Sequence, residues 1–82
     1  MGVVVLRLFA SAREAAGTGR DELPGATVEA VLVAAGARYG EPFRTLVETC
    51  AVWRNGEPCD PSDPVGDADE VAVLPPVSGG SA

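Results

Sequence analysis

Histidine and lysine are absent from this sequence of 82 residues. Histidine is the commonest general base and a common metal ligand, so its absence excludes Ser-His and Cys-His nucleophile pairs and most zinc sites. All six basic residues are arginine, against 12 acidic residues, and the net charge is −6. A chain with this balance and no basic cluster is a poor binder of nucleic acid and of anionic membrane surfaces. The composition therefore argues against a self-sufficient enzyme.

Cysteine and long apolar runs are also scarce. Cys50 and Cys59 form neither a Cys-x-x-Cys pair nor a disulfide framework, so we expect two reduced, buried thiols. No apolar run approaches the ~18 residues of a membrane span, and the N-terminus has no signal-peptide pattern. The aspartates of residues 60–69 lack the spacing of a calcium loop. We therefore expect a cytoplasmic protein that enters no membrane and binds no metal.

The first third of the chain predicts two strands. Alternating apolar residues indicate a strand over residues 3–10, with the faces Val4-Leu6-Leu8 and Val5-Arg7-Phe9. The charged residue on the second face indicates that this face is less buried. Small and polar residues predict a connection without regular structure over 11–19. A short second strand is expected over 20–23, ended by Pro24-Gly25.

Two helices are predicted next. Thr27 can cap the first, and Glu29 suits the positive end of its dipole. Apolar residues at helical spacing then mark one face: Val28, Val31, Leu32 and Ala35. Gly40 is a good residue to end this helix, and Pro42 suits the first turn of a second, shorter one. The apolar residues of that helix are Phe43, Leu46 and Val47.

The last part of the chain predicts a hairpin and a final strand. Asn55-Gly56 is a strong type I′ turn signal between strands over 50–54 and 57–59. A turn-rich loop follows over 60–69, and a strand over 70–74 stops at Pro75-Pro76. This order predicts an α+β, β-grasp (ubiquitin-like) fold, with a mixed sheet of about four to five strands, one main helix and one short helix. The first and last strands would lie adjacent and parallel, within a domain of residues 1–76 followed by a flexible tail over 77–82.

The end of the chain resembles a known family. Residues 69–80, ending Pro-Pro-Val-Ser-Gly-Gly, resemble the terminus of the MoaD/ThiS ubiquitin-like sulfur carriers, and most of all the small subunit of molybdopterin synthase. Phe9-Ala10, with Arg13-Glu14 behind it, resembles the family's first strand and following loop. The helix start at Thr27 and the turn at Asn55-Gly56 also match. Each motif alone is weak, but their order and spacing together are specific.

The resemblance implies a mechanism centred on Gly80. A ubiquitin-activating-type adenylyltransferase would use ATP to adenylate the Gly80 carboxylate, and sulfur would then replace AMP to leave a thiocarboxylate. The carrier itself would bind no cofactor. The sulfur would pass to a synthase large subunit that makes molybdopterin. Val77, Ser78 and Gly79 would thread into the partner's active site, because five residues beyond Pro75 reach about 17 Å when extended.

One departure from the family concerns the last two residues. Ser81-Ala82 follow Gly80, so Gly80 has no free carboxylate in this sequence. A tail-processing peptidase could remove them, they could be an engineered extension, or the protein could have lost its carrier activity. Related alternatives are a carrier for cysteine, thiamine or secondary-metabolite synthesis. Alternatives of another class are a protein modifier joined through Gly80 and a passive β-grasp binding module.

A partner-binding surface follows from strand parity. Phe9 and Leu74 both lie opposite the expected core faces of their strands, so in neighbouring strands they would share the sheet face that the helix leaves open. An exposed apolar patch of this kind marks a binding site. The resemblance places partner contacts at Phe9, Pro58 and Leu74, next to Pro75 and Pro76. The alternative is that Phe9 and Leu74 belong to the core.

Overall fold

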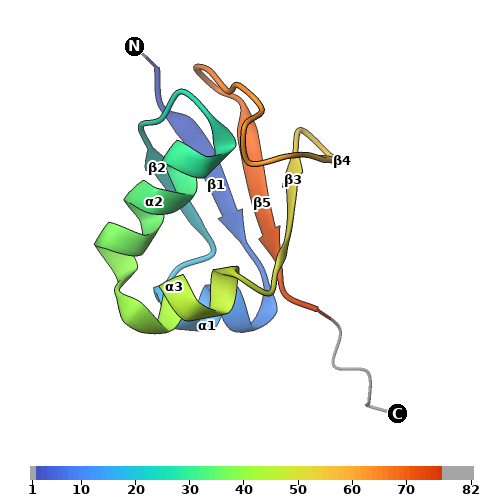
Figure 1. The fold of residues 1–82 in the computed structure, drawn as a ribbon. Helices are drawn as coiled ribbons and strands as arrows, with labels where there is room; N and C mark the ends of the chain where they lie inside the picture. Colours follow the sequence, from blue (N-terminus) through green and yellow to red (C-terminus); the bar gives the residue numbers. More distant parts are fainter. Residues whose placement is uncertain (1, 77–82) are drawn as a thin grey trace.

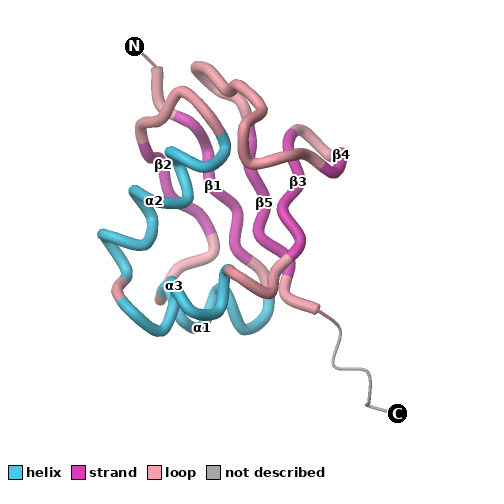
Figure 2. The backbone as a smooth tube through the Cα atoms, in the orientation of Figure 1, coloured by secondary structure: helices cyan, strands magenta, loops and turns pink. Residues whose placement is uncertain are grey.

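Five strands and three helices occupy residues 2–76, the part of the chain that the computed structural model describes (Figures 1 and 2). In chain order the elements are β1 (Val4–Leu8), α1 (Ala10–Ala16), β2 (Arg20–Leu23), α2 (Val28–Tyr39), α3 (Glu41–Val47), β3 (Ala51–Arg54), β4 (Glu57–Pro58) and β5 (Glu70–Leu74). The predicted tail over 77–82 lies outside the described residues, so the division at residue 76 stays a prediction.

The strands form one mixed sheet in the order β2-β1-β5-β3-β4. β1 and β5 are parallel neighbours near the centre, with Leu6 opposite Val71 and Leu8 opposite Val73. The other neighbours are antiparallel. The β-grasp prediction, including the parallel pairing of the first and last strands, is confirmed.

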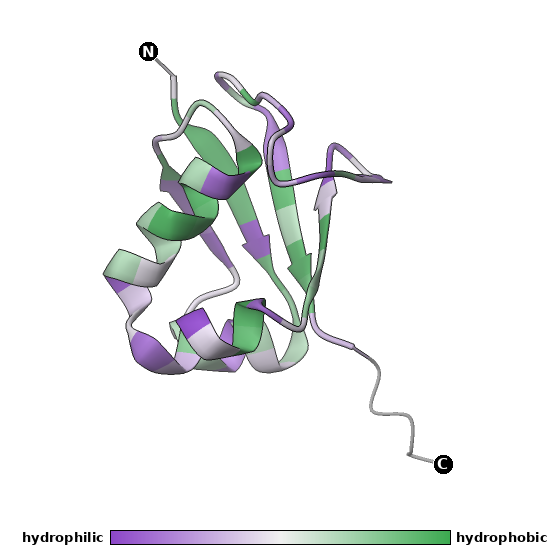
Figure 3. Cartoon of the chain, viewed as in Figure 1, coloured by the Kyte–Doolittle hydropathy of each residue, from purple (hydrophilic) through white to green (hydrophobic). Residues whose placement is uncertain are grey.

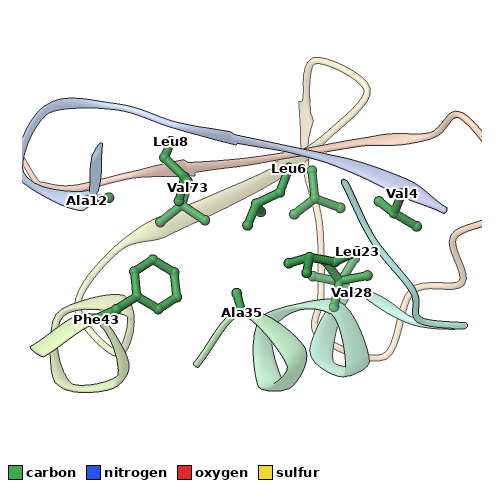
Figure 4. Close-up of a cluster of buried hydrophobic side chains, with 11 residues drawn as sticks. Val4, Leu6, Leu8, Ala12, Leu23, Val28, Ala35, Phe43 and Val73 are labelled. Atoms are coloured by element: carbon green, nitrogen blue, oxygen red, sulfur yellow. The ribbon is translucent and has the colours of Figure 1, made fainter. Parts of the chain in front are cut away.

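The hydrophobic core lies between the sheet and helices α2 and α3 (Figure 4). Alternate strand residues such as Leu6 and Val73 point toward Ala35 of α2 and Phe43 of α3. Phe43 is completely buried, and its ring meets that of Tyr39 edge-on with centroids 5.2 Å apart. Figure 3 shows the same division by hydropathy, with apolar residues along β1, β5 and α2 and polar residues in the loops.

Helix α2 and the hairpin of β3 and β4 form where local sequence signals predicted them. The Thr27 hydroxyl accepts a hydrogen bond from the backbone N–H of Ala30 at 3.1 Å, which caps α2. Of the predicted core face of α2, Leu32 is only partly buried. At the hairpin, Asn55 and Gly56 have φ of 53° and 87°. Positive φ at both positions is the type I′ geometry that the Asn-Gly pair predicts.

Helix α1 corrects the sequence prediction of an unstructured connection over 11–19. The segment Ala10–Ala16 consists mostly of strong helix formers, and the helix ends at Gly17, whose φ is 79°. It was missed because its one buried residue is Ala12, so no large apolar residue marks a helical period. The correction matters for the site, since α1 follows directly on Phe9.

Candidate functional site

The register of the strands determines which residues lie on the helix-free face of the sheet. One row of paired residues crosses all five strands on this face: Arg20, Arg7, Ala72, Trp53 and Pro58. Leu74 and its partner Ala51 belong to the next row. Because residues paired across strands point to the same side, these side chains share one surface. The face is therefore polar toward β2 and apolar toward β3 and β4.

Phe9 and Leu74 lie where the parity argument predicts. Phe9 is 40% exposed, and its extended backbone continues the alternation of β1 past the buried Leu8. Its backbone N–H donates to the carbonyl of Val73 at 3.3 Å, which places Phe9 beside the end of β5. Leu74 is half-buried. The core alternative is therefore wrong for Phe9, and Leu74 lies at the edge of the same open surface.

Trp53 is a component of this surface that the sequence analysis missed. It is 37% exposed and lies directly opposite Ala72 of β5 and Pro58 of β4. Its neighbour Val52 pairs with the buried Val73 and so faces the core. A signal was available in the sequence. In a strand that ends at the Asn-Gly turn, Trp53 and its neighbour Val52 must point to opposite faces of the sheet. We call the residues Phe9, Trp53, Pro58, Ala72 and Leu74 the open-face patch.

An ion pair borders the patch. Arg7 donates to Glu70 at 3.2 Å, and its guanidinium carbon lies 5.6 Å from the centroid of the Phe9 ring. Both charged side chains are about two-fifths exposed, so the pair itself contributes little stability. The contact between the Arg7 guanidinium and the Phe9 ring instead favours a position of the ring beside Arg7.

The chain leaves the sheet at the end of β5. Pro75 is half-buried and Pro76 exposed, and the end of β5 that they follow lies at the same end of the sheet as α1 (Figure 1). Two prolines restrict the direction in which the chain can continue. The predicted tail residues Val77, Ser78, Gly79 and Gly80 lie outside the described residues, as do Ser81-Ala82. The last described residues, Pro75 and Pro76, therefore follow directly on Leu74 of the open-face patch.

The two cysteines are half-buried and unpaired, with Cys50 donating to the carbonyl of Leu46 and Cys59 to that of Val52. Burial raises the pKa of both thiols, which keeps them protonated at neutral pH. The prediction of buried thiols is confirmed only in part, because neither side chain is fully buried. Within residues 2–76 no His, Cys, Asp or Glu cluster is arranged to hold a metal ion. No described helix is long and apolar enough to cross a membrane.

A mixed five-stranded sheet, packed on helices through one face and open on the other, defines a ubiquitin-like protein of the β-grasp class. The model of the ThiS family matches residues 6–80, and the chain belongs to this family. The family comprises ubiquitin-like sulfur carriers and small modifiers, which are generally not catalysts themselves. The comparison with curated proteins found no match.

Several solved structures share the fold over nearly the whole chain. Small archaeal modifier protein 1 (SAMP1) from Methanosarcina acetivorans is 30% identical over 98% of both chains, with a TM-score of 0.88. A putative molybdopterin converting factor subunit 1 from Pyrococcus furiosus is 26% identical over 94% of this chain and 100% of its own, with a TM-score of 0.83. A chain of the BexX/CysO complex from Amycolatopsis orientalis is 25% identical over 94% of this chain and 99% of its own, with a TM-score of 0.79. The last was solved bound to a partner protein.

Proposed function

We propose that this protein is a sulfur carrier for molybdopterin synthesis, with the Gly80 carboxyl group as its reactive site once Ser81-Ala82 have been removed. The observation that supports it most is the juxtaposition of an exposed apolar patch with the root of the terminal segment, at Leu74 and Pro75. A partner bound to the patch would find the reactive end within reach. The family match, which extends to residue 80, supports the same proposal.

The proposed chemistry takes place on the partner enzymes. The Gly80 carboxylate attacks the α-phosphate of ATP on an adenylyltransferase, which releases pyrophosphate and forms an acyl adenylate. Hydrosulfide then displaces AMP to give the thiocarboxylate, or a protein persulfide does so and a thiol reduces the resulting S–S bond. The thiocarboxylate sulfur finally attacks a carbon of a pterin precursor on the synthase large subunit and displaces an oxygen substituent. Water then cleaves the acyl–sulfur bond, which leaves the sulfur on the pterin and restores the Gly80 carboxylate. The carrier presents its terminus and supplies no acid or base.

The described part of the chain contains little that would compete for the activated terminus. An acyl adenylate reacts with thiolates and free amines. Both cysteines are half-buried with raised pKa values, and the sequence has no lysine. The composition that seemed to exclude an active site therefore suits a protein whose own end is the reagent.

The proposal is tested by reconstituting the reaction. The full chain and a version ending at Gly80 are incubated with ATP, sulfide and a molybdopterin-type adenylyltransferase, and intact masses are measured. We expect an oxygen-to-sulfur mass increase in the version ending at Gly80 and none in the full chain. Adding the synthase large subunit and the pterin precursor should then consume the thiocarboxylate. Absence of the mass increase in the shorter version contradicts carrier function.

A second function, protein modification, is favoured by the similarity to SAMP1, whose name describes a modifier. In that reaction the activated Gly80 would form an amide with a lysine of another protein. Expression of the version ending at Gly80 in the native host, followed by proteolysis and mass spectrometry, separates the two. Gly-Gly remnants on target lysines indicate a modifier. A terminal thiocarboxylate without such remnants indicates a carrier, and consumption by a cysteine, thiamine or secondary-metabolite enzyme would identify another acceptor pathway.

A further inference from the structure

Three of the six arginines gather around one open cleft, although the sequence contains no basic run. The cleft lies where β1, β2 and α1 meet, and its lining includes Phe9, Gly19 and the three arginines, Arg7, Arg13 and Arg20. Arg7 and Arg20 are paired across the two strands, and Arg13 comes from the helix. The sequence-based statement that the chain lacks a basic cluster is therefore wrong in three dimensions. We call this feature the arginine cleft.

The arginines of the cleft keep most of their hydrogen-bonding capacity. Arg7 and Arg20 each donate one side-chain hydrogen bond, to Glu70 and Glu22, both at 3.2 Å. These four side chains are between 42% and 58% exposed. Arg13 is exposed and belongs to none of the ion pairs in the described residues. Since a guanidinium has five N–H donors, the cleft offers unused donors to an anionic ligand.

The Arg13 side chain passes beside the backbone just before β2. A Cβ atom at Gly19 would lie 3.4 Å from both Cδ and Nε of Arg13, at ordinary van der Waals distance. The guanidinium therefore passes close to the backbone at Gly19, and it lines the same cleft as Arg20 and Arg7. The three cations come from three elements, so their grouping depends on the folded chain.

The cleft also has a defined position relative to the open-face patch. Phe9 belongs to both, so a protein bound to the patch would lie over the edge of the cleft. Four aspartates, Asp60, Asp63, Asp67 and Asp69, are in the loop that leads into the start of β5, at the opposite end of that strand from Leu74. The cleft thus lies toward the end of β5 that is opposite to this acidic loop.

We propose that the arginine cleft receives the carboxylates of an acidic segment on the protein that docks against the open-face patch. The identity of that protein rests on the proposed carrier function, whereas the charge of its segment does not. Guanidinium groups bind carboxylates and phosphates in similar bidentate geometry, so a nucleotide is the other ligand to consider. Phe9 lines the cleft and belongs to the open-face patch, so a protein bound to the patch brings its own side chains to the cleft. This shared position favours a protein carboxylate.

The test uses the full chain and two anionic probes. Binding of a fluorescein-labelled hexaglutamate peptide and of labelled AMP is followed by fluorescence anisotropy at low ionic strength. The variant R13Q/R20Q removes two cleft charges, and R38Q/R54Q removes two charges elsewhere, so both variants have the same net charge. We expect the first variant to bind the peptide about three- to tenfold more weakly and the second to match the unaltered chain.

Two results would overturn the proposal. Equal weakening in both variants would show that the peptide responds to overall charge and not to a site. Binding of AMP that depends on Arg13 and Arg20, without binding of the peptide, would make the cleft a nucleotide site. Neither measurement involves the tail chemistry, so a failure to form a thiocarboxylate leaves this test unaffected. In the version ending at Gly80, with an active adenylyltransferase, R13Q/R20Q should raise KM for the carrier and leave kcat unchanged.

Discussion

The two faces of the sheet come from the same strands, yet they carry opposite kinds of surface. Leu6 of β1 and Val73 of β5 face the helices and are fully buried, whereas Phe9, just after β1, and Leu74, at the end of β5, reach the open side. The chain contains two phenylalanines, Phe43 in the core and Phe9 on the open face. A residue type alone therefore does not tell a packing role from a binding role. Strand parity and the position of the helices do.

The largest effect on stability is expected from the phenylalanine pair. Phe43→Ala leaves a cavity between α2, α3 and the sheet and should lower the free energy of unfolding by about 3–5 kcal/mol. Phe9→Ala should lower it by about 1 kcal/mol or less, since the ring is 40% exposed. Urea denaturation of both variants measures the difference. Similar losses in the two would mean that Phe9 also belongs to the core.

The substitution Leu74→Glu tests whether the open-face patch binds a partner, because it places a charge among the apolar side chains of the patch. A carboxylate within the apolar open-face patch should weaken partner binding at least about tenfold while the sheet stays folded. Val33→Glu is the matched control, because Val33 is 65% exposed on α2, on the helix side. Adenylation rates and far-ultraviolet circular dichroism report binding and fold separately. An unfolded L74E would show that Leu74 is needed for the core, and an equal loss in V33E would make the effect one of charge alone.

A smaller effect is expected at the hairpin that carries Trp53. Gly56 has φ of +87°, and a Cβ there would meet no atom within 4 Å, so Gly56→Ala should cost about 1–2 kcal/mol through backbone strain alone. Gly66→Ala is the control, since its site is equally open and its φ is not in the left-handed region. Thermal unfolding of both variants should show a lower Tm only for G56A. A loss of stability in G66A as well would point to a packing cause.

The smallest effect concerns acid stability on the helix side. The Tyr39 hydroxyl donates to Asp21 at 2.6 Å and, with Arg38, holds the pKa of Asp21 below its ordinary 3.8. A lowered pKa means that the unfolded chain takes up the proton more readily. The contribution of Asp21 is therefore present above about pH 4 and is lost as the pH falls through its lowered pKa. In Tyr39→Phe, Tm measured against pH should fall less steeply on acidification. An unchanged slope would assign the acid dependence to other carboxylates.

Local signals in the sequence were sufficient for much of the fold. Thr27, Asn55-Gly56 and the alternation around Leu6 determine their elements through neighbours a few residues away, so they could be interpreted without a structure. The alternation also placed Phe9 and Leu74 on one face. Helix α1 was missed because only Ala12 of it is buried.

The rest of the site depends on contacts that are distant in the sequence. The arginine cleft joins Arg7, Arg13 and Arg20 through the pairing of β1 with β2 and through a helix that the pattern did not predict. Trp53 joins the patch only because β3 pairs with β5. The assignment of Gly80 rests on the family resemblance, and it is open to the mass measurement described above.

The position of β5 between β1 and β3 has a consequence for how the chain folds. Two pairs of strands can each form as a local antiparallel unit: β1 with β2, and β3 with β4. No strand pairing connects the two units until β5 inserts between them. β5 is also the last of the described strands to leave the ribosome, and its parallel partner β1 is among the first residues made. Until then, two strand edges stay unpaired and available to other chains. Synthesis that stops before β5 would therefore leave these edges of β1 and β3 open to pairing with other chains.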